Sequence, residues 1–393
     1  MGQAMAAGAD AVRIFVCGDV VDSQESDRVL CCDDVAGVIA EADYAVCNFE
    51  GPLKGGGRPE EKPGCHMFQD KASVSRLKRQ GFGLLLLANN HMLDYGRAGL
   101  EATIREIADQ QLDAIGAGLS YEEAYQPLRK TIGGLTIGFI NACEAQFGVM
   151  DRVRPEGRAG YAWINHSQID KHILELRRVC DYVLVFPHAG LENVPVPLAR
   201  WRERYRHFCD LGADCVIGSH PHVPQGYEQY GRSWIVYSLG NFCFNSMRGI
   251  TGEDRSYSVL VSLCKDKPIT FEVVRHHKEE GRVRLSGKDR AVDVGALNEM
   301  LAAGYEDLVD DISLTVYEKT LRPHLSRCVC PLGYNGSIKS TIKHLLMKGR
   351  QGKQTKRMAA MLMLHLVKNE SYRFACERAL EVVIEGRPSR SGS

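Results

Sequence analysis

The sequence predicts an α/β fold that is followed by a helical C-terminal part, and two observations lead to this prediction. From residue 12 to about 275, short apolar runs alternate with segments of helical periodicity, which is typical of helices packed on the faces of a sheet. Beyond about residue 290 the strand-like runs stop and only helical patterns follow. We therefore expect an α/β domain over residues 1–285 and a helical subdomain over residues 286–393.

The expected strands are short runs rich in β-branched and aromatic residues, with turn-forming residues beside them. They are Val12–Cys17, Ala45–Asn48, Gly83–Ala88, Leu135–Asn141, Tyr182–Pro187, Asp214–Gly218, Ser233–Ser238, Val259–Leu263 and Ile269–Arg275. The helices between them carry apolar residues three or four positions apart. They are Ser26–Glu41, Ala72–Arg79, Arg97–Gln110, Ser167–Cys180 and Pro197–Leu211. In the C-terminal part we expect helices at Ala296–Ala303, Leu308–Thr320, Ile338–Met347, Arg357–Val367 and Tyr372–Ile384.

Composition excludes several classes of protein. The 49 basic and 49 acidic residues give a net charge of zero, so the sequence predicts no nucleic acid as a binding partner. No apolar run approaches the roughly 20 residues of a membrane helix, so no transmembrane segment is expected. The 14 cysteines are scattered without CxxC spacing, and the first ten residues lack the pattern of a secretory signal. These features predict a cytoplasmic protein with reduced thiols.

Polar residues with metal-binding chemistry recur at the ends of the expected strands. In an open α/β sheet, ligands bind at the carboxyl ends of the strands, so residues that follow several strands meet at one edge. Read singly, each has a structural interpretation, since Asp19 follows a glycine as in an ordinary turn and Glu50 precedes a Gly-Pro turn. The candidates after the first three strands are Asp19, Asn48, Glu50, Asn89, Asn90, His91 and Asp94.

Histidines follow the later strands in the same way. His188 ends an apolar run, and Glu192 comes four residues after it. His220 and His222 would point to opposite sides of a regular strand, but across a turn they can converge. Asn241 follows a further strand, where it either orients a ligand or belongs to a structural turn. A single histidine is more often a core or surface residue, but this number at successive strand ends favours a metal site.

The mixture of imidazole, carboxylate and amide groups suits Mn, Zn or Fe better than a structural zinc site rich in thiolates. The sequence therefore predicts one or two divalent metal ions. More than four candidate ligands favour two ions, which share a bridging carboxylate and act on a phosphorus centre.

Six motifs together resemble the CapA family, whose members are named for poly-γ-glutamate capsule biosynthesis and which is similar to the calcineurin-like metallophosphoesterases. The motifs are Gly18–Val20, Asn48–Pro52, Leu87–Gly96, His188–Glu192, Ile217–Gly226 and Tyr237–Phe242. The resemblance spans about residues 12–245 and leaves the helical part outside. It implies a four-layer α/β/β/α metallophosphatase-like sandwich with a C-terminal helical appendage.

The resemblance also implies roles for these residues. His91 would be the general acid that protonates the leaving group. The expected metal ligands are Asp19 and His222 for the first ion, Glu50 as the bridge, and Asn90, His188 and His220 for the second ion. Residues expected to orient a ligand or to face the substrate are Asn48, Asn89, Asp94, Glu192 and Asn241.

One position departs from the wider superfamily. The first motif there reads Asp-x-His, and in this chain Val21 stands where the histidine would be. The first metal would thus lack one ligand, so that its site would be weaker, would recruit Asp22 or Glu192 as a replacement, or would be empty.

These observations favour a metal-dependent hydrolase in the synthesis of a capsule or other surface polymer similar to poly-γ-glutamate. The bond that it cleaves would be a phosphoester or, as the alternative, an amide. Its partners would be a phosphorylated or polymeric small-molecule substrate and a polymer synthase. One alternative is a non-catalytic metal-binding accessory protein of such a synthase, with the helical part as the interface. Another is an intracellular nucleotide phosphodiesterase.

Overall fold

The computed structural model describes residues 11–23, 29–55, 57–151, 158–245, 255–329 and 353–386. It divides into two compact units. The first comprises Met1–Glu60, His66–Glu144 and Gly148–Ala303, and the second comprises Glu61–Cys65, Ala145–Phe147 and Gly304–Ser393. The expected helix at 338–347 lies outside the described residues.

The first unit extends further along the chain than the boundary at 285/286 that we expected. Helix α7 (Val294–Ala302) belongs to this unit. Its Val294 and Leu297 are buried, and the side-chain oxygen of Asn298 accepts a hydrogen bond of 2.8 Å from the backbone N–H of Tyr227. The division therefore falls between Ala303 and Gly304.

An eight-stranded sheet forms one half of the first unit, in the order β17-β16-β15-β1-β2-β3-β4, with β14 paired to β1. The strands β1 to β4 are parallel, and β15 to β17 continue the sheet in antiparallel pairs. The bounds are β1 Val12–Val21, β2 Tyr44–Phe49, β3 Phe82–Leu86, β4 Asp113–Ile115, β14 Asn241–Phe244, β15 Arg255–Leu263, β16 Thr270–Glu279 and β17 Arg282–Leu285.

A six-stranded sheet forms the other half, in the order β12-β13-β11-β10-β7-β6. Its strands β7, β10, β11 and β13 are parallel to one another. The bounds are β6 Leu128–Ile132, β7 Leu135–Cys143, β10 Tyr182–His188, β11 Cys215–Ile217, β12 Tyr227–Tyr230 and β13 Ser233–Val236. A small third sheet joins β5 (Ala117–Gly118), β9 (Gly160–Ala162) and β8 (Val149–Met150).

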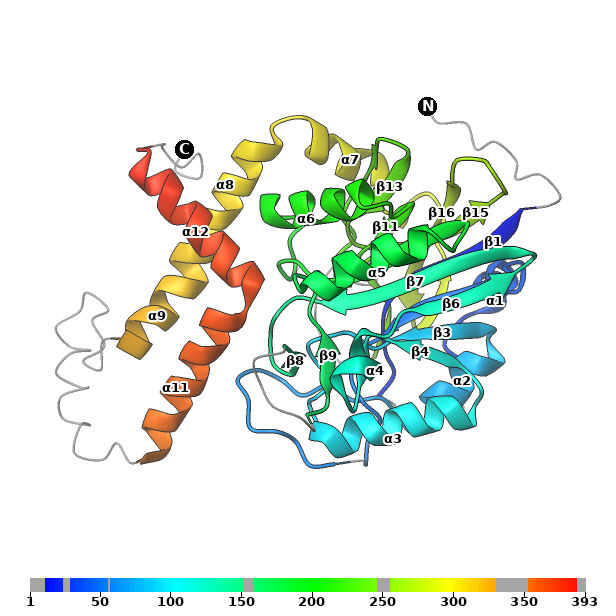
Figure 1. The fold of residues 1–393 in the computed structure, drawn as a ribbon. Helices are drawn as coiled ribbons and strands as arrows, with labels where there is room; N and C mark the ends of the chain where they lie inside the picture. Colours follow the sequence, from blue (N-terminus) through cyan, green and yellow to red (C-terminus); the bar gives the residue numbers. More distant parts are fainter. Residues whose placement is uncertain are drawn as a thin grey trace. The chain divides into compact units, whose positions relative to one another are not determined.

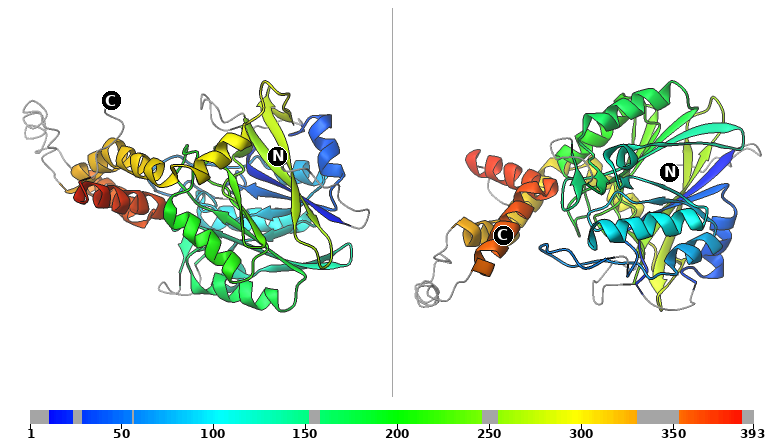
Figure 2. Two further views of the ribbon diagram at one scale, coloured as in Figure 1. Left: turned by 90° about the horizontal axis from the view of Figure 1, so that it is seen from above. Right: turned by 60° about the horizontal axis from the view of Figure 1, so that its bottom comes forward.

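The two large sheets pack face to face and helices cover their outer sides. Helices α5 (Ser167–Arg177) and α6 (Ala199–Asp210) contact the six-stranded sheet, whereas α2 (Ser73–Arg79) and α3 (Gly96–Asp109) contact the eight-stranded sheet (Figure 1). Helix α1 (Asp33–Ala40) contacts β17, and α4 (Tyr121–Tyr125) contacts β5 and β9. The turned views show both sheets between these helices (Figure 2).

The core lies between the inner faces of the sheets. Ile14 and Val46 of the first sheet belong to the same buried apolar cluster as Phe139, Leu184 and Ile217 of the second sheet. Alternate residues of each strand contribute to this cluster, as expected for strands with one face on a core. The four-layer α/β/β/α architecture implied by the resemblance is therefore confirmed.

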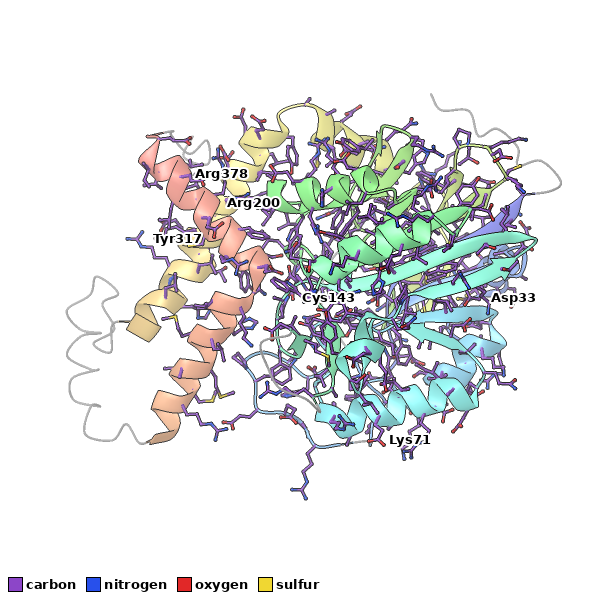
Figure 3. All side chains as sticks on the ribbon, viewed as in Figure 1. Asp33, Lys71, Cys143, Arg200, Tyr317 and Arg378 are labelled. Atoms are coloured by element: carbon purple, nitrogen blue, oxygen red, sulfur yellow. The ribbon has the colours of Figure 1, made fainter. Side chains whose placement is uncertain are left out.

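The described residues of the second unit from Gly304 onward are mostly helical. It contains α8 (Tyr305–Val316), a π-helical segment (Tyr317–Leu321), α9 (Arg322–Val329), α11 (Lys353–Lys368) and α12 (Glu370–Ile384). The Asn369 side chain caps α12 by accepting a hydrogen bond of 2.8 Å from the N–H of Tyr372. Arg378 of α12, labelled in Figure 3, binds Asp310 of α8 with an Nη2–Oδ2 distance of 2.8 Å. Among the described residues, no helix combines the length and the apolarity that crossing a bilayer requires.

Candidate metal centre

Asp19 reaches the site through an irregularity in β1. The register of β1 against β2 shifts between Cys17 and Asp19, and its register against β14 shifts directly after Asp19. Gly18 is required here, because a Cβ at this position would lie 1.8 Å from the carbonyl oxygen of Gly240. Such irregularities re-aim side chains at the edge of a site. Asp19 is fully buried, and its Oδ1 accepts a hydrogen bond of 2.9 Å from Asn48 Nδ2.

Glu50 directly follows β2 and is also fully buried. Neither of its carboxylate oxygens accepts a hydrogen bond. Its backbone is held by Gln69, whose Nε2 donates to the carbonyl oxygens of Glu50 at 2.9 Å and Val20 at 2.7 Å. A buried carboxylate without hydrogen bonds is costly unless a positive charge compensates it. This arrangement is the one expected of a residue that binds a cation.

The three histidines of the candidate site come from the second sheet. His188 is the last residue of β10, and His220 and His222 lie in the loop after β11. The loop histidines have φ angles of 100° and 62°, which are uncommon for residues other than glycine. The ring centroids of His188 and His220 are 4.6 Å apart, and those of His220 and His222 are 6.0 Å apart. The unusual backbone of this loop thus accompanies the convergence of all three imidazoles.

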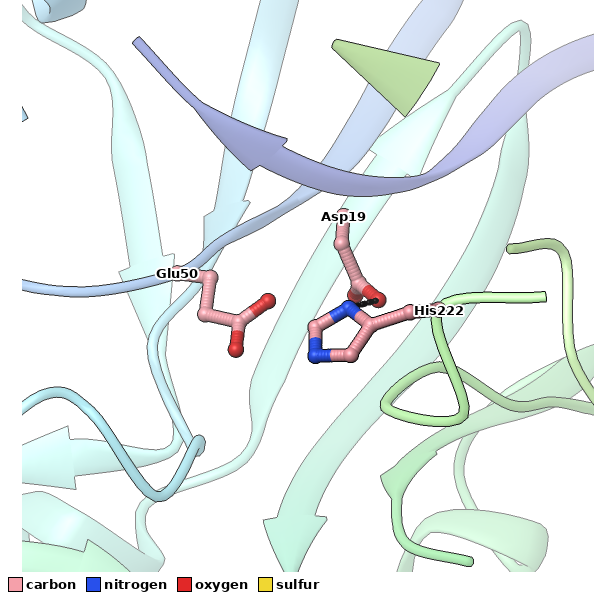
Figure 4. A group of neighbouring side chains, drawn as sticks. All are labelled: Asp19, Glu50 and His222. Carbon is pink, nitrogen blue, oxygen red and sulfur yellow. Dashed lines mark ion pairs between the residues drawn. The ribbon is translucent and has the colours of Figure 1, made fainter. Parts of the chain in front are cut away.

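The contributions of the two sheets meet at Asp19. Its Oδ2 lies 3.5 Å from His222 Nδ1, and its Oδ1 lies 3.9 Å from His188 Nδ1. Asp19, Glu50 and His222 each offer one ligand atom, and these atoms all lie within 4.8 Å of one another. Figure 4 shows the Glu50 carboxylate and the His222 ring directed toward the same space. Two carboxylates and an imidazole in this arrangement fit a divalent cation of the Mn, Zn or Fe type.

The segment after β3 completes the group. The Oδ1 of Asn90 lies 3.2 Å from His188 Nε2. His91 Nδ1 lies 2.7 Å from Asp94 Oδ2, whereas its Nε2 is 3.9 Å from Glu50 Oε1. The structure therefore brings together all six residues expected to bind metal, together with His91.

Two asparagines support the loops of the site. The Oδ1 of Asn89 accepts hydrogen bonds from the N–H groups of Gly51 at 3.2 Å and His91 at 3.3 Å, which ties the segments after β2 and β3 to each other. Asn241, the first residue of β14, places its Oδ1 at 3.0 Å from His222 Nδ1. Both side chains thus hold candidate site residues in position.

Burial shifts the pKa values of the carboxylates and of the imidazoles in opposite directions, because it disfavours the charged form of each group. It raises the pKa of Glu50 well above its usual range and lowers that of His188 well below. It also lowers the pKa of His220 to about 4. Burial lowers the pKa of His222 too, but the charges of Glu50 and Asp19 outweigh it and raise that pKa well above 6.5. A proton on His222 thus offsets carboxylate charge that a divalent cation would also offset.

Neither Asp22 nor Glu192, the two residues that could replace the missing histidine of the first motif, lies where a ligand of the first metal would be expected. Val21 is buried in the core. The buried Asp22 pairs with Arg76, whose Nη2 lies 2.6 Å from Asp22 Oδ2. Glu192 is exposed, although its charge acts on the site by opposing part of the decrease that burial causes in the pKa of His220. Asp22 is therefore engaged elsewhere, and Glu192 lies at the rim.

Sequence reasoning missed Glu144, which directly follows β7. This residue is fully buried, and its Oε1 lies 3.6 Å from His220 Nε2. The expected strand ended at Asn141, but β7 continues to Cys143, which Figure 3 labels. The available signal was the same as elsewhere: an apolar strand that ends in a polar residue. Asn141 itself is structural, since it bonds the backbones of Ala88 and Phe186.

Comparison with protein families gives one match over residues 13–246, to the bacterial capsule synthesis protein family PGA_cap. The chain belongs to this family. The CapA "PGA biosynthesis protein" of Bacillus subtilis (strain 168) is 34% identical over 242 residues, which are 60% of this chain and 62% of that protein. The CapA "capsule biosynthesis protein" of Bacillus anthracis is 31% identical over 254 residues, 63% of this chain and 61% of that protein. The match thus covers less than two thirds of either relative.

A more distant relative is a "probable polyglutamine synthesis accessory protein" of Mycobacterium tuberculosis (strain ATCC 25618 / H37Rv), which is 25% identical over 229 residues, 56% of this chain and 60% of that protein. Among solved structures, the 5'-nucleotidase precursor of Thermus thermophilus has a TM-score of 0.41 at 11% identity and covers 75% of this chain and 58% of its own. The calcineurin-like phosphoesterase YfkN of Bacillus subtilis has a TM-score of 0.37 at 13% identity, with 76% and 98% covered.

Proposed function

We propose that this member of the capsule synthesis family is a metal-dependent hydrolase that cleaves a phosphoester in the synthesis of a surface polymer. The observation that carries the proposal is the Glu50 carboxylate, which is fully buried without a hydrogen bond and faces the imidazole of His222. The names of the Bacillus relatives support the link to a poly-γ-glutamate-like polymer. The substrate would be a phosphorylated or polymeric small molecule.

Six residues would hold two divalent ions. Asp19 and His222 would bind the first, Glu50 would bridge, and Asn90, His188 and His220 would bind the second. Bound there, the ions would lower the pKa of a water molecule and offset the charge that develops on the phosphoryl oxygens.

His91 would act as the general acid of the reaction. Its Nδ1 lies 2.7 Å from Asp94 Oδ2, and Asp94 is fully buried. The carboxylate fixes the orientation of the ring. The opposite nitrogen, Nε2, is directed toward Glu50 at 3.9 Å and would donate its proton to the leaving group of a substrate in the site.

One observation favours a second function, that of a non-catalytic accessory protein for a polymer synthase. The position of a first-metal histidine is held by the buried Val21, and Asp22 pairs with Arg76 instead of joining the site. The first ion would then have fewer protein ligands. The Mycobacterium relative is also named as an accessory protein.

A cytoplasmic location and the absence of a nucleic acid partner remain predictions.

Elemental analysis of the purified chain, together with hydrolysis of a generic aryl phosphomonoester and phosphodiester in Mn, tests the proposal. We expect about two ions per chain and Mn-dependent turnover. Replacing His91 with alanine should lower turnover by about 10² to 10⁴-fold with the metal retained, since general acid catalysis contributes about that factor. His220→Ala should lose metal and turnover together.

The Asp22→Asn variant is the matched control. It alters a buried carboxylate that lies near the site in the sequence but pairs with Arg76. It should keep the wild-type metal content. Bound metal without turnover on a broad substrate panel would favour the accessory function, and a wild-type chain that binds no metal would contradict both functions.

A further inference from the structure

Glu144 is a fully buried carboxylate that the roles above leave unassigned. It lies at the carboxyl end of β7, beside β10, whose last residue is His188. The Oε1 of Glu144 is 3.6 Å from Nε2 of His220, which is ion-pair range and slightly beyond a hydrogen bond. A buried carboxylate is costly unless polar groups compensate it. The ring of His220 is one polar group that the Glu144 carboxylate faces within ion-pair range.

The backbone of Glu144 is fixed from several sides. Its N–H donates to the carbonyl oxygen of His188 at 3.1 Å, and its carbonyl oxygen accepts from the hydroxyl of the buried Tyr161 at 3.2 Å. These two bonds hold the backbone of Glu144 in place, so its side chain starts from a fixed point.

We propose that Glu144 is a positioning residue that sets the tautomer and orientation of His220 for metal binding. This inference rests on the proposed function. A proton on Nε2 faces the carboxylate, and the Nδ1 lone pair is then the one that binds a cation. Histidines that bind metals commonly donate their second ring N–H to a carboxylate in this manner, and the loss of that partner weakens metal affinity about 10 to 100-fold.

The loop geometry explains why His220 needs such a partner. His220 has a φ of 100°, and the loop is held to Asp19, whose Oδ2 accepts from the N–H of His220 at 3.3 Å. This bond fixes the backbone but leaves the ring able to turn about its side-chain bonds. Glu144 approaches from β7, a different strand, and acts on the ring itself. The two acidic residues therefore control different parts of the same histidine.

Titration of full-length protein with Mn by calorimetry, and with Co as a spectroscopic probe, tests the inference. We expect Glu144→Ala to weaken metal affinity about 10 to 100-fold and to change the visible spectrum of the Co-loaded protein. Glu144→Gln should recover part of the affinity, because its amide oxygen can face the Nε2 proton as the carboxylate oxygen does. A residue that only supports the fold would not give this rescue together with a spectral change.

The control is Asp214→Asn. Asp214 is a buried carboxylate in the same sheet, but it precedes β11 at the opposite end of the parallel strands and binds Arg177 at 2.8 Å. This variant should keep the wild-type affinity and spectrum.

Wild-type affinity and spectrum in both Glu144 variants would overturn the inference while leaving the proposed function intact. Loss of metal from Glu144→Gln as complete as from His220→Ala would also overturn it, because Glu144 would then be a direct ligand. A wild-type chain that binds neither metal would overturn the inference and the proposed function together.

Discussion

The two sheets contribute different chemistry to one site. Among the expected metal ligands, the eight-stranded sheet and the segments after its strands supply the oxygen groups of Asp19, Glu50 and Asn90. The six-stranded sheet and its loops supply the imidazoles of His188, His220 and His222. Burial raises the pKa of Glu50 and lowers that of His188, so it disfavours the charged form of both groups, whereas the nearby carboxylates favour the charged form of His222. Without a cation, both sets of buried groups carry an electrostatic cost. The positive charge of a cation would favour ionised carboxylates beside neutral imidazoles.

The largest expected effect follows from replacing Glu50, a carboxylate among the oxygen ligands, with an uncharged residue. Glu50→Gln removes a buried carboxylate whose oxygens accept no hydrogen bond. Without metal, we expect the variant to be no less stable than the wild type, because glutamine is uncharged, whereas a buried glutamate either holds a proton or buries a charge. Saturating Mn at 100 times its Kd should stabilise the wild type by about 2.7 kcal/mol and the variant far less. Thermal unfolding in chelator and in Mn measures both effects. A variant less stable than the wild type in chelator would contradict this account.

The imidazole half should respond differently. His188→Gln should weaken Mn affinity as well, because the residue is an expected ligand. Since burial already keeps His188 neutral, the substitution relieves no charge, and stability in chelator should not rise. Parallel unfolding of His188→Gln and Glu50→Gln in chelator makes the comparison. Equal stabilisation by both substitutions would show that the two halves are not electrostatically distinct.

The oxygen and imidazole groups could be predicted from the sequence because each follows a recognisable apolar strand. The run from Leu84 to Ala88, followed by Asn-Asn-His, is the clearest case. The convergence of these ends follows from the parallel order of the strands. The sequence alone left open whether His220 and His222 converge, because the answer depends on positive φ angles in their loop.

Other features could not be predicted because they depend on contacts distant in sequence. Arg76 engages Asp22 across 54 residues, and no local pattern indicates that pairing. Glu144 was missed because the strand before it ends two residues later than its β-branched run suggests. The two-residue strands β5 and β8 carry too little periodicity to be recognised. Helix α7 reads as part of the helical segment, but its apolar face packs on the first unit.

The next largest expected effect concerns a histidine outside the site, whose burial makes stability depend on pH. His276 of β16 lies in the oxygen-rich sheet, is buried, and has its Nε2 2.9 Å from Ser258 Oγ. Burial lowers its pKa to about 3. Between pH 6.5 and 3 the unfolded chain therefore binds a proton that the folded chain does not, so stability falls as the pH falls through this range, by at most about 1.4 kcal/mol per pH unit.

The variant His276→Gln should reduce this acid sensitivity. Urea unfolding at pH 7, 5.5 and 4.5 should show a smaller loss of stability in the variant than in the wild type. Identical losses in both would mean that His276 does not titrate in this manner and that the acid response comes from other groups.

The smallest expected effect concerns the reverse case, a carboxylate in the imidazole-rich sheet. Glu228 of β12 binds Arg202 with an Nη2–Oε2 distance of 2.5 Å and Arg206 with an Nε–Oε1 distance of 2.8 Å, and it accepts a hydrogen bond from Tyr237. Burial favours the protonated acid, but these donors outweigh burial and lower the pKa of Glu228 to about 2. Its contribution to stability is thus fully present above about pH 4.5 and is lost as the pH falls toward 2.

Glu228→Gln should therefore lower stability at pH 7 by about 1 to 2 kcal/mol, a value reduced for the partial exposure of the network. The difference from the wild type should shrink as the pH approaches 2, where both chains carry a neutral group. Glu279→Gln is the matched control, because Glu279 of β16 in the other sheet binds Arg290 in a more exposed ion pair. This variant should leave the unfolding midpoint nearly unchanged. An equal deficit of Glu228→Gln at pH 7 and pH 2.5 would assign its effect to packing, because loss of charge alone predicts that the two chains converge in acid.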